Sequence, residues 1–307
     1  MEAKELHVVS TSVEAVQIAY DFVNVAEEQY LISKVDAVGS SSVKLKAWQS
    51  LNGRRSMYWG GSLTKNGSLV PAPLPDFMDR TWPNVMQRIE RLDIFRNVPT
   101  DIKGKGKAPN HCLVNEYLPG QGIMPHTDGP AYFPLVATLS LGSHAVLKLV
   151  PRSVDELREV EIEGNGCNGS RQPHACTPFT VFLPPRSLVV LSDTIYSNYL
   201  HSIEPIKLDS MQDLMACTNW DDWWLKSAGG LTSELEQAKT GAASVEPSDQ
   251  GDENRQRSGE TFQSKEELVQ EVVARRRMVE SAQGWERARR ISLTCRRVDK
   301  VVKGLRP

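Results

Sequence analysis

Short apolar runs recur along residues 111–220, and Pro, Gly or Ser residues separate each run from the next. The clearest runs are Leu135–Leu141, Ala145–Val150, Phe179–Leu183, Ser187–Leu191 and Leu214–Thr218. Runs of this length with turn residues between them are typical of β-strands joined by tight connections. The sequence therefore predicts a mainly β, α+β protein built as an antiparallel sandwich or barrel, of which the jelly roll is one form.

The first hundred residues have a different pattern. Asn24 is followed three residues later by Glu27, an arrangement that can cap the start of a helix. Asn52-Gly53 lies between apolar segments and predicts a hairpin. Residues 82–96 carry apolar side chains at a helical spacing. We therefore expect N-terminal helices and one hairpin outside the sandwich.

The composition changes again over residues 229–263, which are rich in Ser, Gly, Gln, Glu and Asp. Such a segment buries too little apolar surface to offset its ordering entropy, so it is predicted to be a disordered insertion. A capping box at Ser264 opens a further helix, and Arg290–Val298 reads as a strand. We expect residues 1–228 and 264–307 to form one domain that the insertion interrupts.

Charge and cysteine usage exclude several classes of protein. The 36 basic and 38 acidic residues give a formal charge of −2, so a strongly basic nucleic-acid binder is excluded, although a local basic patch is not. No segment approaches the roughly 20 apolar residues of a membrane span, and the N-terminus lacks an apolar signal core. The five cysteines are scattered and never form C-x-x-C, which argues against a disulfide framework and a thiolate zinc site. We expect a monomer in the cytoplasm and nucleus, without membrane association.

One motif favours a metal site. In Pro125-His126-Thr127-Asp128, the His and Asp are two residues apart, so on an extended chain both side chains point the same way. His201 follows a later strand-like run and is the natural third ligand. Two His and one carboxylate form the facial triad of non-haem Fe(II) oxygenases. Most H-x-D tripeptides are structural, however, and zinc also binds such a set.

A second motif favours a carboxylate ligand. Residues 290–296 alternate strictly between two faces. One face carries Arg290, Ser292, Thr294 and Arg296, and the other carries Ile291, Leu293 and Cys295. The planar guanidinium pairs well with carboxylates, so an inward-facing strand would bind a dicarboxylate. The alternative is a solvated edge strand whose arginines prevent edge pairing.

Four motifs occur in a fixed order along the chain. They are Asn115-Glu116-Tyr117, Pro119–Pro130 with its H-x-D, His201-Ser202-Ile203, and Arg290–Arg296. In this order they resemble the AlkB family of Fe(II)/2-oxoglutarate dioxygenases. Three more stretches resemble one branch, the sixth AlkB homologue: Asn52–Gly61, Pro134–His144 and Leu183–Leu191.

The resemblance implies a double-stranded β-helix (jelly roll) with N-terminal helices and a nucleotide-recognition lid hairpin. By matching positions it implies Fe(II) ligands at His126, Asp128 and His201. It also implies 2-oxoglutarate contacts from Asn115, Tyr117, Arg290, Ser292 and Arg296. Where many relatives have Asn in the arginine motif, this chain has Ser292, as some other relatives do.

The implied activity is oxidative demethylation of N-methylated RNA or DNA, which consumes O₂ and 2-oxoglutarate. Four lid residues would bind a single-stranded nucleic acid. Arg54 and Arg55 would contact its phosphates, and the base would stack on Tyr58 and Trp59. Alternatively, Tyr58 and Trp59 are hydrophobic hairpin residues packed beneath the lid. Two other functions stay open, a dioxygenase acting on protein and a nucleic-acid-binding relative with little turnover.

Overall fold

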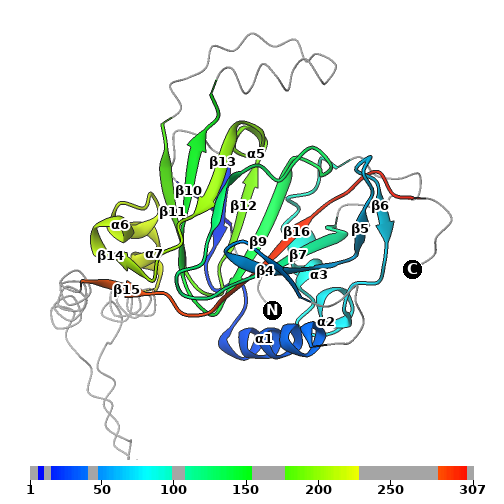
Figure 1. Ribbon diagram of the computed structural model, residues 1–307, viewed down its shortest axis with the longest axis horizontal. Coiled ribbons are helices and arrows are strands. Elements are labelled where there is room, and N and C mark those ends of the chain that lie inside the picture. Colours follow the sequence, from blue (N-terminus) through cyan, green and yellow to red (C-terminus); the bar gives the residue numbers. More distant parts are fainter. Residues whose placement is uncertain are drawn as a thin grey trace, which may run out of the picture.

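The computed structural model describes residues 6–9, 15–40, 48–98, 108–153, 177–227 and 283–302. In these residues two antiparallel sheets pack against each other as a jelly roll, and helices cover the larger sheet (Figure 1). The predicted mainly β, jelly-roll architecture is confirmed. The predicted insertion at 229–263 and the helix expected from Ser264 lie outside the described residues.

The larger sheet has eight strands among the described residues. In spatial order they are β1 (His7–Val8), β2 (Val16–Ala19), β12 (Leu188–Ser192), β9 (Leu135–Leu141), β16 (Arg290–Arg296), β7 (His111–Tyr117), β4 (Arg54–Trp59) and β3 (Gln49–Leu51). The smaller sheet contains, in order, β11 (Phe179–Leu183), β10 (Ala145–Pro151), β13 (Tyr199–Ile203) and β8 (Ile123–His126). Two short pairs complete the strands: β5 (Gly61–Leu63) with β6 (Leu69–Pro71), and β14 (Leu208–Ser210) with β15 (Gly284–Glu286).

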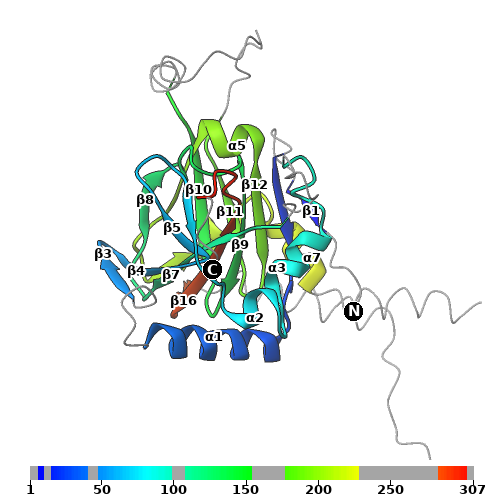
Figure 2. The same cartoon turned by 90° about the vertical axis from the view of Figure 1, so that its right-hand side faces the viewer.

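The N-terminal helix α1 (Val25–Gly39) begins with the predicted capping box. The Asn24 side chain accepts a hydrogen bond from the Glu27 amide at 2.9 Å, and the Glu27 carboxylate accepts one from the Asn24 amide at 2.9 Å. Figures 1 and 2 show α1 along the lower side of the molecule, near α2 (Asp76–Asp79) and α3 (Val85–Arg91). Its buried residues Leu31 and Val35 share a core with the larger sheet.

Two elements differ from the sequence prediction. The helix expected over 82–96 is shorter because Asn84 caps it, accepting a hydrogen bond from the Gln87 amide at 3.2 Å. The expected strand Leu214–Thr218 is wrong, since Ser210 caps a helix there instead.

The other helices are α5 (Asp193–Asn198), α6 (Met211–Met215) and α7 (Trp220–Ser227). Among the described residues, none of the helices is long and apolar enough to cross a membrane.

Strand β16 lies between β9 and β7, so it is not an edge strand. Its apolar face joins the core beneath the helices, and all seven of its residues are buried. The polar face points the other way, toward the smaller sheet. The strict alternation is therefore confirmed, and the alternative of a solvated edge is wrong for β16.

The predicted Asn52-Gly53 hairpin is also confirmed, as the turn between β3 and β4. In β4, Met57 and Trp59 point into the helix-side core, where they are 1% and 3% exposed. The Trp59 ring packs edge-on against Phe77, with 5.5 Å between centroids. Tyr58 lies on the opposite face of the strand and is 40% exposed. The predicted stacking of a base on Trp59 is therefore wrong, because period-two alternation places this ring in the core.

We expect Trp59→Ala to destabilise the protein by about 3–5 kcal/mol, as is usual for truncation of a buried aromatic residue. Tyr58→Ala is the matched control and should cost much less, because its ring is already partly in water. Denaturant unfolding monitored by circular dichroism measures both variants. Equal losses in the two variants would contradict the burial of Trp59.

Candidate metal centre and co-substrate cavity

The H-x-D motif and His201 come together through strand pairing. Strands β8 and β13 are antiparallel neighbours, and their register places His126 opposite His201. Asp128 follows two residues after His126 and turns toward the same point. One ligand atom from each of these residues lies within 4.8 Å of the others, and the two imidazole centroids are 4.3 Å apart. This arrangement could hold one metal ion.

The hydrogen bonding of one imidazole and the burial of the other suit metal binding. The Nδ1 atom of His126 lies 2.8 Å from the Met124 carbonyl oxygen, which can only accept a hydrogen bond. Nδ1 therefore donates to this carbonyl, so Nε2 is the nitrogen that the neutral ring offers to a metal. Burial lowers the pKa of His201 to about 4, so its ring is neutral at pH 7. Neutral imidazole is the ligating form.

Asp128 is also held by Arg296, which donates a hydrogen bond to Oδ1. Burial disfavours the charge of Arg296, but Asp128 and Tyr132 outweigh this effect and raise its pKa. The Tyr132 ring lies 4.7 Å from the guanidinium. The Tyr196 hydroxyl donates to the Gly129 carbonyl at 2.8 Å. Sequence reasoning missed both tyrosines, because only the tertiary contacts bring them to the metal ligands.

A cavity of about 190 Å³ lies between the two sheets and includes all three candidate ligands in its wall. The five residues expected to contact 2-oxoglutarate also line it: Asn115, Tyr117, Arg290, Ser292 and Arg296. The structure thus brings together every residue predicted for the metal and the co-substrate.

Arg290 is a buried cation at this cavity, only 4% exposed. It donates one hydrogen bond to the Ser140 hydroxyl at 2.8 Å and lies over the Tyr117 ring at 5.6 Å. Its Nε has no hydrogen-bond partner, and no carboxylate among the described residues pairs with it. Burial accordingly lowers its pKa to about 10. A buried guanidinium facing a cavity without a counter-charge fits a carboxylate ligand.

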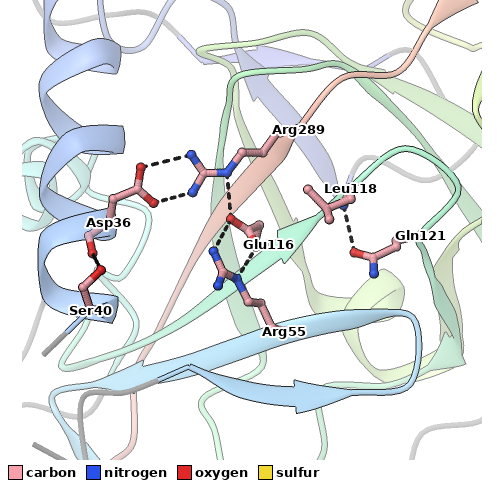
Figure 3. A network of polar contacts seen from close by, with 7 residues as sticks. All are labelled: Asp36, Ser40, Arg55, Glu116, Leu118, Gln121 and Arg289. Atoms are coloured by element: carbon pink, nitrogen blue, oxygen red, sulfur yellow. Dashed lines mark hydrogen bonds and ion pairs between the residues drawn. The ribbon is translucent and has the colours of Figure 1, made fainter. Parts of the chain in front are cut away.

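The two lid arginines face opposite ways. Arg54 lines the cavity, whereas Arg55 points to the helix side and pairs through two nitrogens with Glu116 (Figure 3). The predicted phosphate contact of Arg55 is therefore wrong, because alternation turns this side chain away from the site and Glu116 neutralises it.

Glu116 is the centre of a network that sequence reasoning did not find. It also accepts a hydrogen bond from Arg289 at 2.7 Å, and Arg289 pairs with Asp36 of α1 (Figure 3). Burial would raise the pKa of Glu116, but Arg55 and Arg289 together hold it below its usual range. The period-two pattern could have revealed the network, since it puts Arg55, Glu116 and Arg289 on the helix-facing side.

Comparison with known proteins decides the class of the site. Residues 56–296 match the 2OG-Fe(II) oxygenase superfamily. This chain belongs to that superfamily. The superfamily uses Fe(II) and 2-oxoglutarate, which agrees with the donor set and with the unpaired Arg290. The chain is therefore an oxidoreductase with these two cofactors, and the zinc alternative is wrong.

Individual relatives lie within the AlkB group. The chain is 32% identical over 209 residues to "Probable RNA/DNA demethylase ALKBH6" of Danio rerio, covering 68% of this chain and 77% of the relative. It is 28% identical over 199 residues to "Alkylated DNA repair protein ALKBH8 homolog" of Arabidopsis thaliana, covering 63% of this chain and 51% of the relative. The solved structure of OsALKBH1 aligns with a TM-score of 0.45 at 13% identity, over 92% of this chain and 96% of that one. The resemblance to the AlkB family is thus confirmed by the first of these relatives.

We expect His201→Ala to weaken Fe(II) binding sharply, because a facial triad loses one of its three protein ligands. Anaerobic calorimetric titration with Fe(II) measures the affinity directly. His7→Ala is a suitable control, because His7 lies on β1 outside the cavity. Binding by the His201 variant as tight as in the wild type would remove His201 from the ligand set.

We expect Arg290→Ala to weaken 2-oxoglutarate binding more than Arg290→Lys. Loss of one partner of a desolvated charge pair typically costs 2–5 kcal/mol, so the Kd should rise at least about tenfold. Lysine keeps the charge but cannot form the paired hydrogen bonds of the guanidinium, so it should restore only part of the affinity. Titration of the metal-loaded protein with 2-oxoglutarate gives both values. Unchanged affinity in the alanine variant would place the co-substrate elsewhere.

Proposed function

We propose that this oxygenase removes N-methyl groups from single-stranded RNA or DNA. In this proposal Fe(II) is held by His126, Asp128 and His201. The 2-oxoglutarate is held by Arg290 and Ser292 at its distal carboxylate, with Asn115 and Tyr117 beside it and Arg296 near its C1 end. The observation that carries the proposal is the single cavity in which the three ligands and the uncompensated Arg290 meet.

When bound, Fe(II) and 2-oxoglutarate supply O₂ activation coupled to oxidative decarboxylation, which yields succinate and CO₂ and hydroxylates the N-methyl carbon. The hydroxymethyl group then leaves as formaldehyde. The protein orients and shields this chemistry. Apolar side chains from β10, β11 and β12 line the cavity and exclude water: Leu147, Leu183, Val189 and Leu191. Arg296, whose guanidinium lies over the Tyr132 ring, donates a hydrogen bond to the carboxylate of Asp128.

The substrate class rests on the similarity to a relative named as an RNA/DNA demethylase and on an exposed aromatic ring of the lid. Tyr58 lies on the same face of β4 as Arg54, and it stacks on His111 with 5.6 Å between centroids and 30° between planes. Burial, aided by Arg296, lowers the pKa of His111 to about 4, so this support is uncharged at pH 7. The outer part of the Tyr58 ring offers a surface on which a base can stack.

The test is release of succinate and formaldehyde with N-methylated single-stranded RNA, N-methylated single-stranded DNA and a methylated histone peptide. We expect a methylated oligonucleotide to give both products in equal amounts and its unmethylated counterpart to give no formaldehyde. Base stacking is worth about 1–3 kcal/mol, so Tyr58→Ala should raise the KM for the oligonucleotide by about tenfold while Tyr58→Phe keeps it. Trp82→Ala is the matched control, since Trp82 is also exposed but lies beside α3 and packs on Tyr30.

Two results would overturn the proposal. Formaldehyde release with the peptide alone would indicate a protein substrate. Binding of Fe(II) and 2-oxoglutarate without turnover of any methylated substrate would indicate a relative that binds but does not demethylate.

A further inference from the structure

Arg290 is the first residue of β16, where the sheet holds it on one side only. Its register partner in β7 is Tyr117, whereas pairing of β16 with β9 begins one residue later, at Ile291 opposite Leu141. The position of Arg290 therefore depends on the chain that leads into the strand. The last residue of this connection between β15 and β16 is Arg289.

Side-chain contacts anchor the first part of this connection. Arg287 donates from two nitrogens to Asp209 of β14, at 2.6 and 2.7 Å. The Ala288 amide donates to the Ser143 hydroxyl at 2.9 Å. The chain is thus fixed up to the residue before Arg289.

Arg289 itself is anchored to two elements at once. Its Nε donates to Glu116 of β7 at 2.7 Å, and its terminal nitrogens donate to Asp36 of α1, one of them at 3.1 Å (Figure 3). Glu116 also accepts two hydrogen bonds from Arg55 of β4, whose guanidinium lies 4.5 Å from the centroid of the Trp48 ring. One carboxylate thus ties the end of the connection to β7 and β4.

Glu116 is buried on the side of the sheet that is turned away from the cavity. Its side chain is 4% exposed, and three hydrogen bonds from two guanidiniums satisfy it. Hydrogen bonds between ionised partners are roughly twice as strong as neutral ones. The network therefore restricts the backbone at Arg289, and with it the point from which the Arg290 side chain enters the cavity.

Arg290 needs this support because no carboxylate among the described residues pairs with it. Its contacts are the Ser140 hydroxyl and the Tyr117 ring, neither of which is charged. A guanidinium binds a carboxylate through two parallel hydrogen bonds, and this pairing tolerates little error in direction. A guanidinium that is in place before the co-substrate arrives also lowers the entropy cost of binding.

We infer that Glu116 is a positioning residue for the co-substrate site. Through Arg289 it holds Arg290 in the direction that the distal carboxylate of 2-oxoglutarate requires. This inference rests on the proposed assignment of Arg290 to that carboxylate, and it is independent of the methylated substrate.

The candidate metal ligands lie apart from this network. His126 and His201 belong to the smaller sheet. Arg296, which contacts Asp128, is at the opposite end of β16 from Arg290. Loss of Glu116 should therefore weaken the binding of 2-oxoglutarate and leave the binding of Fe(II) unchanged, whereas a general loss of folding would weaken both.

The experiment measures two affinities for each variant by anaerobic calorimetric titration, Fe(II) into the metal-free protein and 2-oxoglutarate into the metal-loaded protein. Glu116→Gln keeps the shape of the side chain and removes its charge. We expect it to raise the Kd for 2-oxoglutarate by about tenfold, the order usual for loss of a group that orients a ligand-binding residue. The Kd for Fe(II) should stay within about twofold of the wild type, because separated sites act independently. Glu116→Asp keeps the charge and should recover part of the lost affinity.

Arg289→Gln tests the route from Glu116 to Arg290. It should raise the Kd for 2-oxoglutarate about as much as Glu116→Gln does. The double variant should add little to either single variant, because two changes to one contact are not additive. Arg55→Gln leaves the contact between Glu116 and Arg289 in place and should have a smaller effect.

Glu27→Gln is the matched control. The Glu27 side chain is 3% exposed and pairs with Arg88 at 2.8 Å, in the first turn of α1 and outside the cavity. Glutamine at this position can still accept the capping hydrogen bond from the Asn24 amide. Melting temperatures of the two variants report the cost of losing a buried ion pair, and only Glu116→Gln should also lose affinity for 2-oxoglutarate.

The inference fails on any of three results. The first is an unchanged Kd for 2-oxoglutarate in both Glu116→Gln and Arg289→Gln. The second is an equal loss of affinity in Glu27→Gln, which would show a general effect of removing a buried charge. The third is a loss in Arg55→Gln as large as in Arg289→Gln, which would exclude the route through Arg289.

The Arg290→Ala titration separates this inference from the proposed function. Weakened binding in Arg290→Ala together with unchanged binding in the Glu116 and Arg289 variants would overturn the inference alone. Unchanged binding in Arg290→Ala would overturn the proposed co-substrate contact and the inference together. If Glu116→Gln fails to fold, Arg289→Gln decides.

Discussion

Strand β16 is hydrogen-bonded to β7 on one side and to β9 on the other, and this double pairing sets the position of the groups in the cavity. The register places Arg290 beside Tyr117, and Ser292 beside both Asn115 and Ser140. The opposite face of the same strand packs in the core beneath the helices. Burial of that apolar face offsets part of the cost of removing two arginines from water.

Consecutive arginines in this protein serve opposite faces of the sheet. Arg55 and Arg289 point to the helix side, where Glu116 and Asp36 neutralise them. Arg54 and Arg290 are their respective neighbours in the sequence and line the cavity, and no carboxylate in the described part of the chain forms an ion pair with either. The paired arginines, Arg55 and Arg289, hold the strands in place. The unpaired arginines, Arg54 and Arg290, have N–H groups available to bind ligands. Perturbed, uncompensated charge of this kind is typical of functional sites.

The sequence predictions that were wrong share one cause. Trp59 and Arg55 are of the right type to bind a nucleic acid, but they lie on the wrong face of β4. The segment Leu214–Thr218 has the composition of a strand, but the Ser210 cap favours a helix over the residues that follow it. In each case the residue type does not give the direction of the side chain or the local conformation, because backbone geometry decides both. The period-two alternation that separates the two faces of residues 290–296 also separates Arg54 from Arg55 and Tyr58 from Trp59.

The sequence by itself determined the strand-rich architecture, the capping box of α1, the lid hairpin and the two faces of β16. These features depend on alternation and on caps, which act over a few residues and are therefore visible in the local pattern. The H-x-D spacing likewise implied that His126 and Asp128 share a direction. Only the tertiary structure decided that His201 lies across from His126, that Tyr132 lies against Arg296, that Tyr196 donates to Gly129, and which arginines pair with a carboxylate. The contacts of the site and of the Glu116 network join residues from 61 to 253 positions apart, and they arise from strand order and sheet packing, which local patterns do not specify.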